Sequence, residues 1–97
     1  YQVDCVFEND HHVYKRTHPI TGGKIDQEKG ILYLGDGSWG VNTRVIRKDW
    51  QKKRPWLARA ESLNHLIRVD MTARGFHYRA FKADGELIDE TRRPIRR

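Results

Sequence analysis

The stretch LNHLIRVDMTARGFHYRAFKADGELID, residues 63–89, decides the fold that we expect for this chain of 97 residues. Apolar and polar side chains alternate along residues 63–70. A period of two is typical of β-strands that bury one face. Residues 73–75 and the pair Asp84-Gly85 contain the glycines that tight turns favour. We therefore predict an antiparallel meander over this stretch.

A second strand is expected near the start of the chain, followed at once by a polar turn. Residues 3–7 are short, β-branched and aromatic, which favours a buried strand over a helix. In the next segment, NDHHVYKR at residues 9–16, Asp10 and His12 are two positions apart. In an extended chain such side chains point to the same side. Because zinc, iron and manganese accept oxygen and imidazole nitrogen as ligands, the spacing predicts that Asp10 and His12 bind one metal ion or two adjacent ones.

The order of residues in this turn resembles the last motif of the calcineurin-like metallophosphoesterases. In their purple acid phosphatase-like branch the motif usually reads G-H-x-H-x-Y-x-R. This chain has Asn9, Asp10, His12, Tyr14 and Arg16 at the five matching positions. The resemblance implies that Asp10 and His12 bind a divalent or mixed-valence metal pair of Fe, Zn or Mn. It also implies that Tyr14 and Arg16 contact a phosphate ester substrate.

Several interpretations of the turn stay open. Asp10 departs from the family pattern, and its negative charge would change the metal preference and the acidity of a bound water. If the register slips by one residue, His11 is the ligand. Otherwise His11 is a candidate general acid that protonates the leaving alkoxide, because an imidazole titrates near neutral pH. A non-functional alternative has Tyr14 packed on the sheet and Arg16 paired with a carboxylate such as that of Glu8.

The resemblance extends over nearly all of the chain. Residues 17–20 resemble the loop after the motif, residues 30–37 the next strand and its glycine loop, and residues 63–89 the closing hairpin. The implied fold is a β-rich α/β class with a mostly antiparallel sheet of four to five strands, as in the C-terminal part of a metallophosphoesterase-type β-sandwich domain. Residues 1–97 are then a single C-terminal fragment of a catalytic domain.

This fragment would supply late metal ligands to a hydrolase and be inactive by itself. The further aspartates, Asn and His of the family would come from the remainder of the catalytic domain, which is one expected partner; the phosphate ester substrate is the other. A third possibility is a purely structural domain with a degenerate metal turn, which the carboxylate at Asp10 encourages.

Residues 38–60 form an insertion that is basic and rich in tryptophan. Between residues 44 and 59 there are seven Lys and Arg residues against Asp49 alone, with Trp39, Trp50 and Trp56 interleaved. The rings either anchor the loop on the sheet or face a substrate. The alternative function is a small basic β-rich module that binds nucleic acid or another polyanion, since rings stack on bases while cations hold phosphates.

The net charge, the cysteine count and the length of the apolar runs limit the possible classes of this protein. The formal charge of +6 falls to +2 without the four arginines of the basic tail, residues 92–97, so overall charge argues little for a nucleic-acid partner. A single cysteine, Cys5, excludes an internal disulfide framework. The longest apolar runs are a few residues, so we expect no membrane partner, and the cell compartment stays open.

Overall fold

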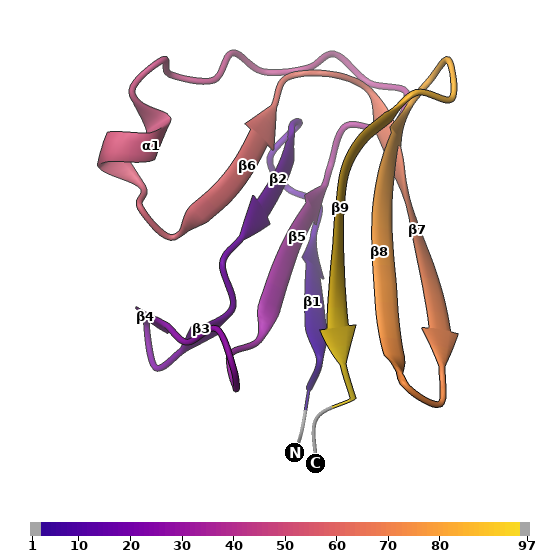
Figure 1. Ribbon diagram of the computed structural model, residues 1–97. Helices are drawn as coiled ribbons and strands as arrows, with labels where there is room; N and C mark the ends of the chain where they lie inside the picture. The colour runs from indigo at the N-terminus through magenta and orange to yellow at the C-terminus, as the bar shows by residue number, and fades with distance from the viewer. Residues whose placement is uncertain (1–2, 96–97) are drawn as a thin grey trace.

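The computed structural model describes residues 3–95, which fold into two facing β-layers and a small hairpin (Figure 1). The four-stranded sheet has the order β1-β5-β2-β6 and the three-stranded sheet the order β7-β8-β9, while β3 and β4 pair with each other. The strands are β1 (Cys5–Glu8), β2 (Tyr14–Thr17), β3 (Ile20–Thr21), β4 (Lys24–Ile25), β5 (Leu32–Asp36), β6 (Leu57–Glu61), β7 (His65–Thr72), β8 (Gly75–Lys82) and β9 (Leu87–Pro94).

The predicted β-rich class with mostly antiparallel strands is confirmed; one of the sheets has four strands, and a second sheet has three. The meander of residues 63–89 forms as expected, as the antiparallel strands β7, β8 and β9. It forms a layer of its own because the chain changes layers between β6 and β7. The four-stranded sheet is mixed, since β1 runs parallel to β5 while β2 is antiparallel to both β5 and β6. A period of two predicts that a strand forms, but not which strand it pairs with.

The core lies between the two layers. Leu32 and Leu34 of β5 are each 1% exposed and pack with the buried ring of Tyr78 from β8. Cys5 and Phe76 are partly buried against this cluster. Complete burial of a leucine side chain stabilises the folded state by about 1.5–3 kcal/mol. The side chains that β5 and β8 bury between the layers therefore hold the two sheets face to face.

A buried polar contact also joins the layers. The Asp89 carboxylate of β9 accepts hydrogen bonds from the Tyr14 hydroxyl at 2.6 Å and from Arg16 Nε at 2.7 Å, both from β2. Arg16 Nη2 donates to the other carboxylate oxygen at 3.2 Å, so the guanidinium binds in a bidentate manner. Only 7% of the Asp89 side chain is exposed. Glu8 pairs with Lys15 at 2.9 Å, so the carboxylate partner of Arg16 is Asp89 and not Glu8.

The chain end differs from the predicted tail. Strand β9 continues to Pro94, so residues 92–94 belong to the sheet. Arg93 donates hydrogen bonds to the Gln27 carbonyl at 2.7 Å and to the Gly30 carbonyl at 3.2 Å, which attaches β9 to the segment after the β3-β4 hairpin. Arg96 and Arg97 lie outside the described residues.

The predicted basic insertion connects β5 to β6. Its ordered part includes one helical turn, α1 (Trp50–Lys53), and its last residues, 57–60, belong to β6. In Figure 1 the insertion crosses the end of the molecule where β1 leads into β2, and α1 lies beside β6. Within residues 3–95 no helix is long and apolar enough to cross a membrane.

Candidate metal turn and the two cavities beside it

The turn between β1 and β2, residues 9–13, is held by Glu8. Glu8 Oε1 accepts the backbone N–H of Asp10 at 2.7 Å and that of His11 at 3.1 Å. Partial burial opposes ionisation of Glu8, but Lys15 and these two N–H groups outweigh it and lower the pKa of the Glu8 carboxyl. An ionised Glu8 therefore anchors the start of the turn at neutral pH.

Gly37, just after β5, packs against the backbone of the turn. A Cβ at this position would lie 2.4 Å from the His11 carbonyl oxygen and 2.6 Å from the Asn9 carbonyl oxygen. Because both neighbours are backbone atoms, the turn reaches its position only against a residue without a side chain. Sequence reasoning grouped Gly37 with a glycine loop but missed this packing role; a glycine at the end of an apolar strand was the available signal.

One ring nitrogen of His12 is held by a hydrogen bond, and the other has no hydrogen-bond partner among residues 3–95. Its Nδ1 lies 3.1 Å from the Asn42 carbonyl oxygen. A carbonyl only accepts, so Nδ1 carries the proton and Nε2 of the neutral ring has a free lone pair. Metal-binding histidines use this arrangement, because the hydrogen bond fixes both the tautomer and the orientation of the ring. His12 therefore fits the role of a single metal ligand.

Asp10 and His12 do not line the same one of the two cavities beside the turn. Residues 10–13 bend instead of continuing β1, so the spacing of two no longer places the side chains on one side. His12 lines a cavity of about 530 Å³ together with Asp36, Trp39 and His65, here called the Trp39 cavity. Asp10 is exposed and lines neither this cavity nor the one described next. Within residues 3–95, no three His, Cys, Asp or Glu side chains form a group able to hold a metal ion.

His11 faces a second cavity, of about 560 Å³, on the outer face of the four-stranded sheet. We call it the tryptophan cavity; its lining includes His11, Lys15, Tyr33, Trp50, Arg54 and Trp56. Burial, followed by the charges of Lys15 and Arg44, lowers the pKa of His11. A smaller fraction of His11 is therefore protonated at neutral pH than of an ordinary histidine, which opposes its predicted role as a general acid.

Tyr14 and Arg16, predicted to bind substrate, point into the interior between the layers. Their polar groups contact Asp89, and the Tyr14 ring is 2% exposed. Burial and the neighbouring Asp89 raise the pKa of Tyr14, so its hydroxyl stays protonated and donates. The structure gives both residues a packing contact, and their substrate role stays a prediction.

His65, which lines the Trp39 cavity, forms a buried contact with Ser38. Ser38 Oγ donates to the Leu63 carbonyl at 2.6 Å and lies 2.9 Å from His65 Nδ1. His65 is 2% exposed, and its ring meets the Tyr14 ring edge-on at 5.0 Å. Burial lowers the pKa of His65. The contact joins residues 27 positions apart, so no local sequence motif predicts it.

The three tryptophans of the insertion do not form one surface. Trp50 and Trp56 line the tryptophan cavity, whereas Trp39 lines the Trp39 cavity and is 76% exposed. A single strand of nucleic acid would therefore not meet the three rings as consecutive stacking platforms. This arrangement weakens the alternative of a nucleic-acid module.

Comparisons of the chain with protein-family models, with curated proteins and with solved structures found no match.

Proposed function

We propose that this chain is the C-terminal part of a metal-dependent phosphoesterase of the purple acid phosphatase-like type, and that it contributes late metal ligands. The observation that carries the proposal is the ring of His12, whose Nδ1 is engaged by the Asn42 carbonyl and whose Nε2 has no hydrogen-bond partner among residues 3–95. His12 is the proposed ligand, with Asp10 as the second. A bound Fe, Zn or Mn pair would acidify a water and stabilise charge on the phosphoryl oxygens.

The chain's own residues have distinct parts in this proposal. Glu8 orients the turn through the N–H groups of Asp10 and His11. His11 is the proposed proton-transfer group, and its lowered pKa favours the accepting, neutral form. Since Asp10 and His12 are too few ligands for a metal site, the other ligands must come from the remainder of the catalytic domain. The isolated chain should therefore bind metal weakly and hydrolyse no ester.

Substitutions in the complete catalytic domain test the assignment. His12→Ala should remove both metal and turnover, because Ala has no donor atom. Asp10→His should retain activity with an altered metal preference. His11→Ala should lose on the order of 10²–10⁴-fold in rate with full metal content, as expected for a lost proton-transfer group. The measurement is metal stoichiometry alongside phosphate ester hydrolysis, with His18→Ala as a control outside the turn.

One outcome would reverse the register. If His12→Ala keeps its metal and rate while His11→Ala loses both, then His11 is the ligand. If neither variant changes metal content, the turn is not a metal site.

A further inference from the structure

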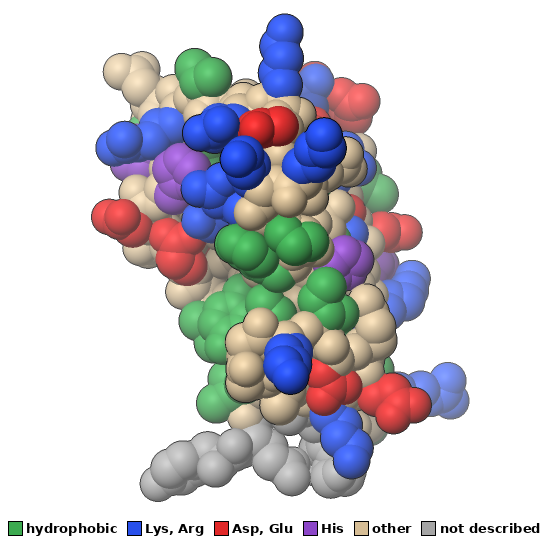
Figure 2. Space-filling model, turned by 90° about the vertical axis from the view of Figure 1, so that its left-hand side faces the viewer, with side chains coloured by type: hydrophobic (Ala, Val, Ile, Leu, Met, Phe, Trp, Pro, Cys, Tyr) green, Lys and Arg blue, Asp and Glu red, His purple; other side chains and the backbone are tan. Residues whose placement is uncertain are grey.

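The tryptophan cavity has an apolar floor. Its base is the outward row of the four-stranded sheet, where Lys15 lies between Gly35 on β5 and Ala60 on β6. The Lys15 side chain extends over Gly35, where an added Cβ would lie 2.5 Å from Lys15 Cγ, so its aliphatic part covers the centre of the floor. Tyr33 and Leu57 continue the lining along the same sheet. Figure 2 faces this side of the molecule and shows hydrophobic side chains gathered below a cluster of Lys and Arg.

Two aromatic side chains line the cavity from the insertion. Trp50 belongs to α1 and is half-buried, while Trp56 directly precedes β6 and is 43% exposed. Indole rings offer broad flat faces that stack on other planar rings, and such stacking contributes about 1–3 kcal/mol per nucleic-acid base. Exposed rings beside a concave apolar surface are therefore available to a planar ligand.

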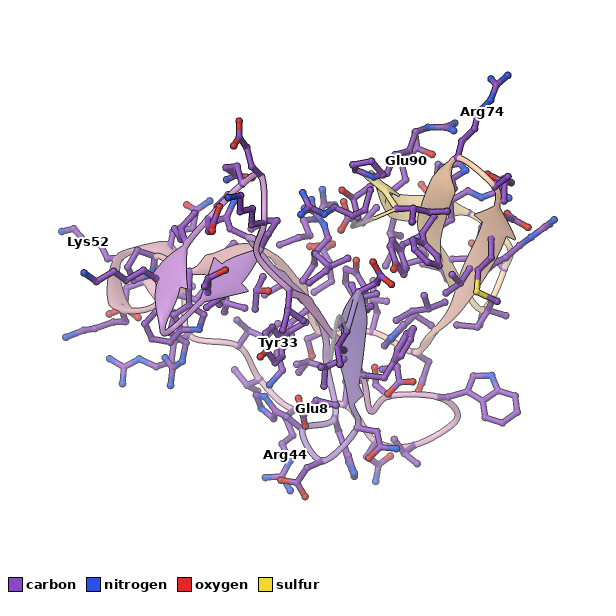
Figure 3. All side chains as sticks on the ribbon, turned by 90° about the horizontal axis from the view of Figure 1, so that it is seen from below. Glu8, Tyr33, Arg44, Lys52, Arg74 and Glu90 are labelled. Atoms are coloured by element: carbon purple, nitrogen blue, oxygen red, sulfur yellow. The ribbon has the colours of Figure 1, made fainter. Side chains whose placement is uncertain are left out.

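The cationic side chains around the cavity differ in whether a carboxylate pairs with them. Lys15 pairs with Glu8 at 2.9 Å and Arg47 with Asp49 at 3.1 Å. Within residues 3–95, the Arg54 guanidinium has neither an ion pair nor a side-chain hydrogen bond. In Figure 3, Tyr33, Glu8 and Arg44 lie on the same side of the four-stranded sheet, and Lys52 projects away from them on α1. A free guanidinium at the rim of a cavity suits a phosphate group, which it binds through two parallel N–H donors.

We propose that the tryptophan cavity binds a phosphate monoester of an aromatic compound, of the class of nucleoside monophosphates, with the ring against Trp50 and Trp56 and the phosphate on Arg54. The volume of about 560 Å³ lies within the range of about 300–1,000 Å³ typical of small-ligand sites. A small ligand fits better than a polymer because Trp39 lies at the other cavity. This binding goes beyond the proposed hydrolysis, since it requires no metal and no contact with His12.

Tryptophan fluorescence of the full chain tests the proposal. Trp39→Phe removes the ring outside the cavity, so the remaining signal comes from Trp50 and Trp56. AMP is titrated in the presence of EDTA, with adenosine and inorganic phosphate in separate titrations. We expect AMP to quench the signal at concentrations at least about tenfold lower than either part alone, because ring and phosphate are held together.

Two variants identify the phosphate contact. In the Trp39→Phe background, Arg54→Gln should weaken AMP about tenfold to hundredfold and leave adenosine unchanged, as expected for a lost charge-assisted hydrogen bond. Lys52→Gln removes the same charge from α1 outside the cavity and should leave AMP binding within about twofold of the parent.

Three results would overturn the inference: no quenching by AMP, equal affinity for AMP and phosphate, or equal losses in Arg54→Gln and Lys52→Gln. The last two would indicate non-specific attraction to a basic surface. Because metal is absent throughout, none of these results depends on whether the chain belongs to a phosphoesterase.

Discussion

At the scale of single residues, burial changes the pKa of His65 and of Cys5. His65 is one of the most completely buried side chains among the described residues. Its Nδ1 contacts Ser38, and a neutral ring satisfies this contact without a buried charge. Cys5 follows the same rule, since burial, helped by the nearby Asp4, raises the pKa of its thiol to about 11. The thiol therefore stays protonated and unreactive at neutral pH.

His65 predicts a loss of stability in mild acid. Its pKa is lowered in the folded state, so below pH of about 6.5 the unfolded chain takes up a proton that the folded chain refuses. The stabilisation is thus complete above that pH and is lost as the pH falls through it. The free energy of unfolding, measured in urea, should therefore fall as the pH is lowered from about 6.5 to about 5.5.

The control is His18, a partly buried residue between β2 and β3 that is outside the Ser38–His65 contact. His65→Gln should flatten this part of the pH profile, whereas His18→Gln should leave it unchanged. An equally steep profile in His65→Gln would assign the acid sensitivity to other groups.

At the scale of elements, the turn of residues 9–13 depends on a neighbour that follows β5. Strand β1 runs parallel to β5, with Glu8 opposite Gly35, so the ends of both strands meet at the same edge of the sheet. There the carbonyl oxygens of Asn9 and His11 pack on Gly37. The bend that separates Asp10 from His12 is therefore set by packing and not by the local sequence.

Gly37→Ala should displace this turn. The new methyl group would lie 2.4 Å from a backbone oxygen, so either the turn or the β5 loop must move. We expect a destabilisation of about 1–3 kcal/mol, as for other overpacked sites. The NMR signals of the His11 and His12 imidazoles should also shift.

Gly40→Ala is the matched control on the same loop. It meets no atom within 4 Å, but its φ of +72° strains any residue with a side chain. It should cost stability without moving the imidazole signals. Unchanged signals in Gly37→Ala would show that the turn does not rest on this glycine.

At the scale of the whole molecule, Asp89 joins two layers whose strands lie far apart in the sequence. It pairs with Arg16 and Tyr14 across the sandwich, at separations of 73 and 75 residues along the chain. The carboxylate opposes the effect of burial and raises the pKa of Arg16, so the guanidinium stays charged. Such a pair specifies how β9 sits over β2 even if its net contribution to stability is small.

Asp89→Ala should destabilise the fold by about 3–5 kcal/mol, because Arg16 would be left as a largely buried charge without its partner. Replacing both residues, Asp89→Leu with Arg16→Met, should recover most of the loss. Chemical denaturation measures all of these variants. Asp70→Ala removes a more exposed carboxylate that pairs with Arg68 at 3.1 Å and also with Arg79, and it should cost less stability than Asp89→Ala. A loss no larger in Asp89→Ala than in Asp70→Ala would contradict the role of Asp89 as a buried link.

The local features of this protein can be predicted from its residue pattern. A period of two and the turn glycines are enough to predict the strands of the meander, and an apolar run followed by polar residues predicts β1 and its turn. Other features depend on contacts between segments that are far apart in the sequence, and these features become visible only in the folded protein. These features are the division into two layers, the opposite cavities faced by His11 and His12, the partner of Arg16, and the separation of Trp39 from Trp50 and Trp56. The physical reason is that alternation records which face of a strand is buried, whereas the partner that buries it is chosen by packing across the whole chain.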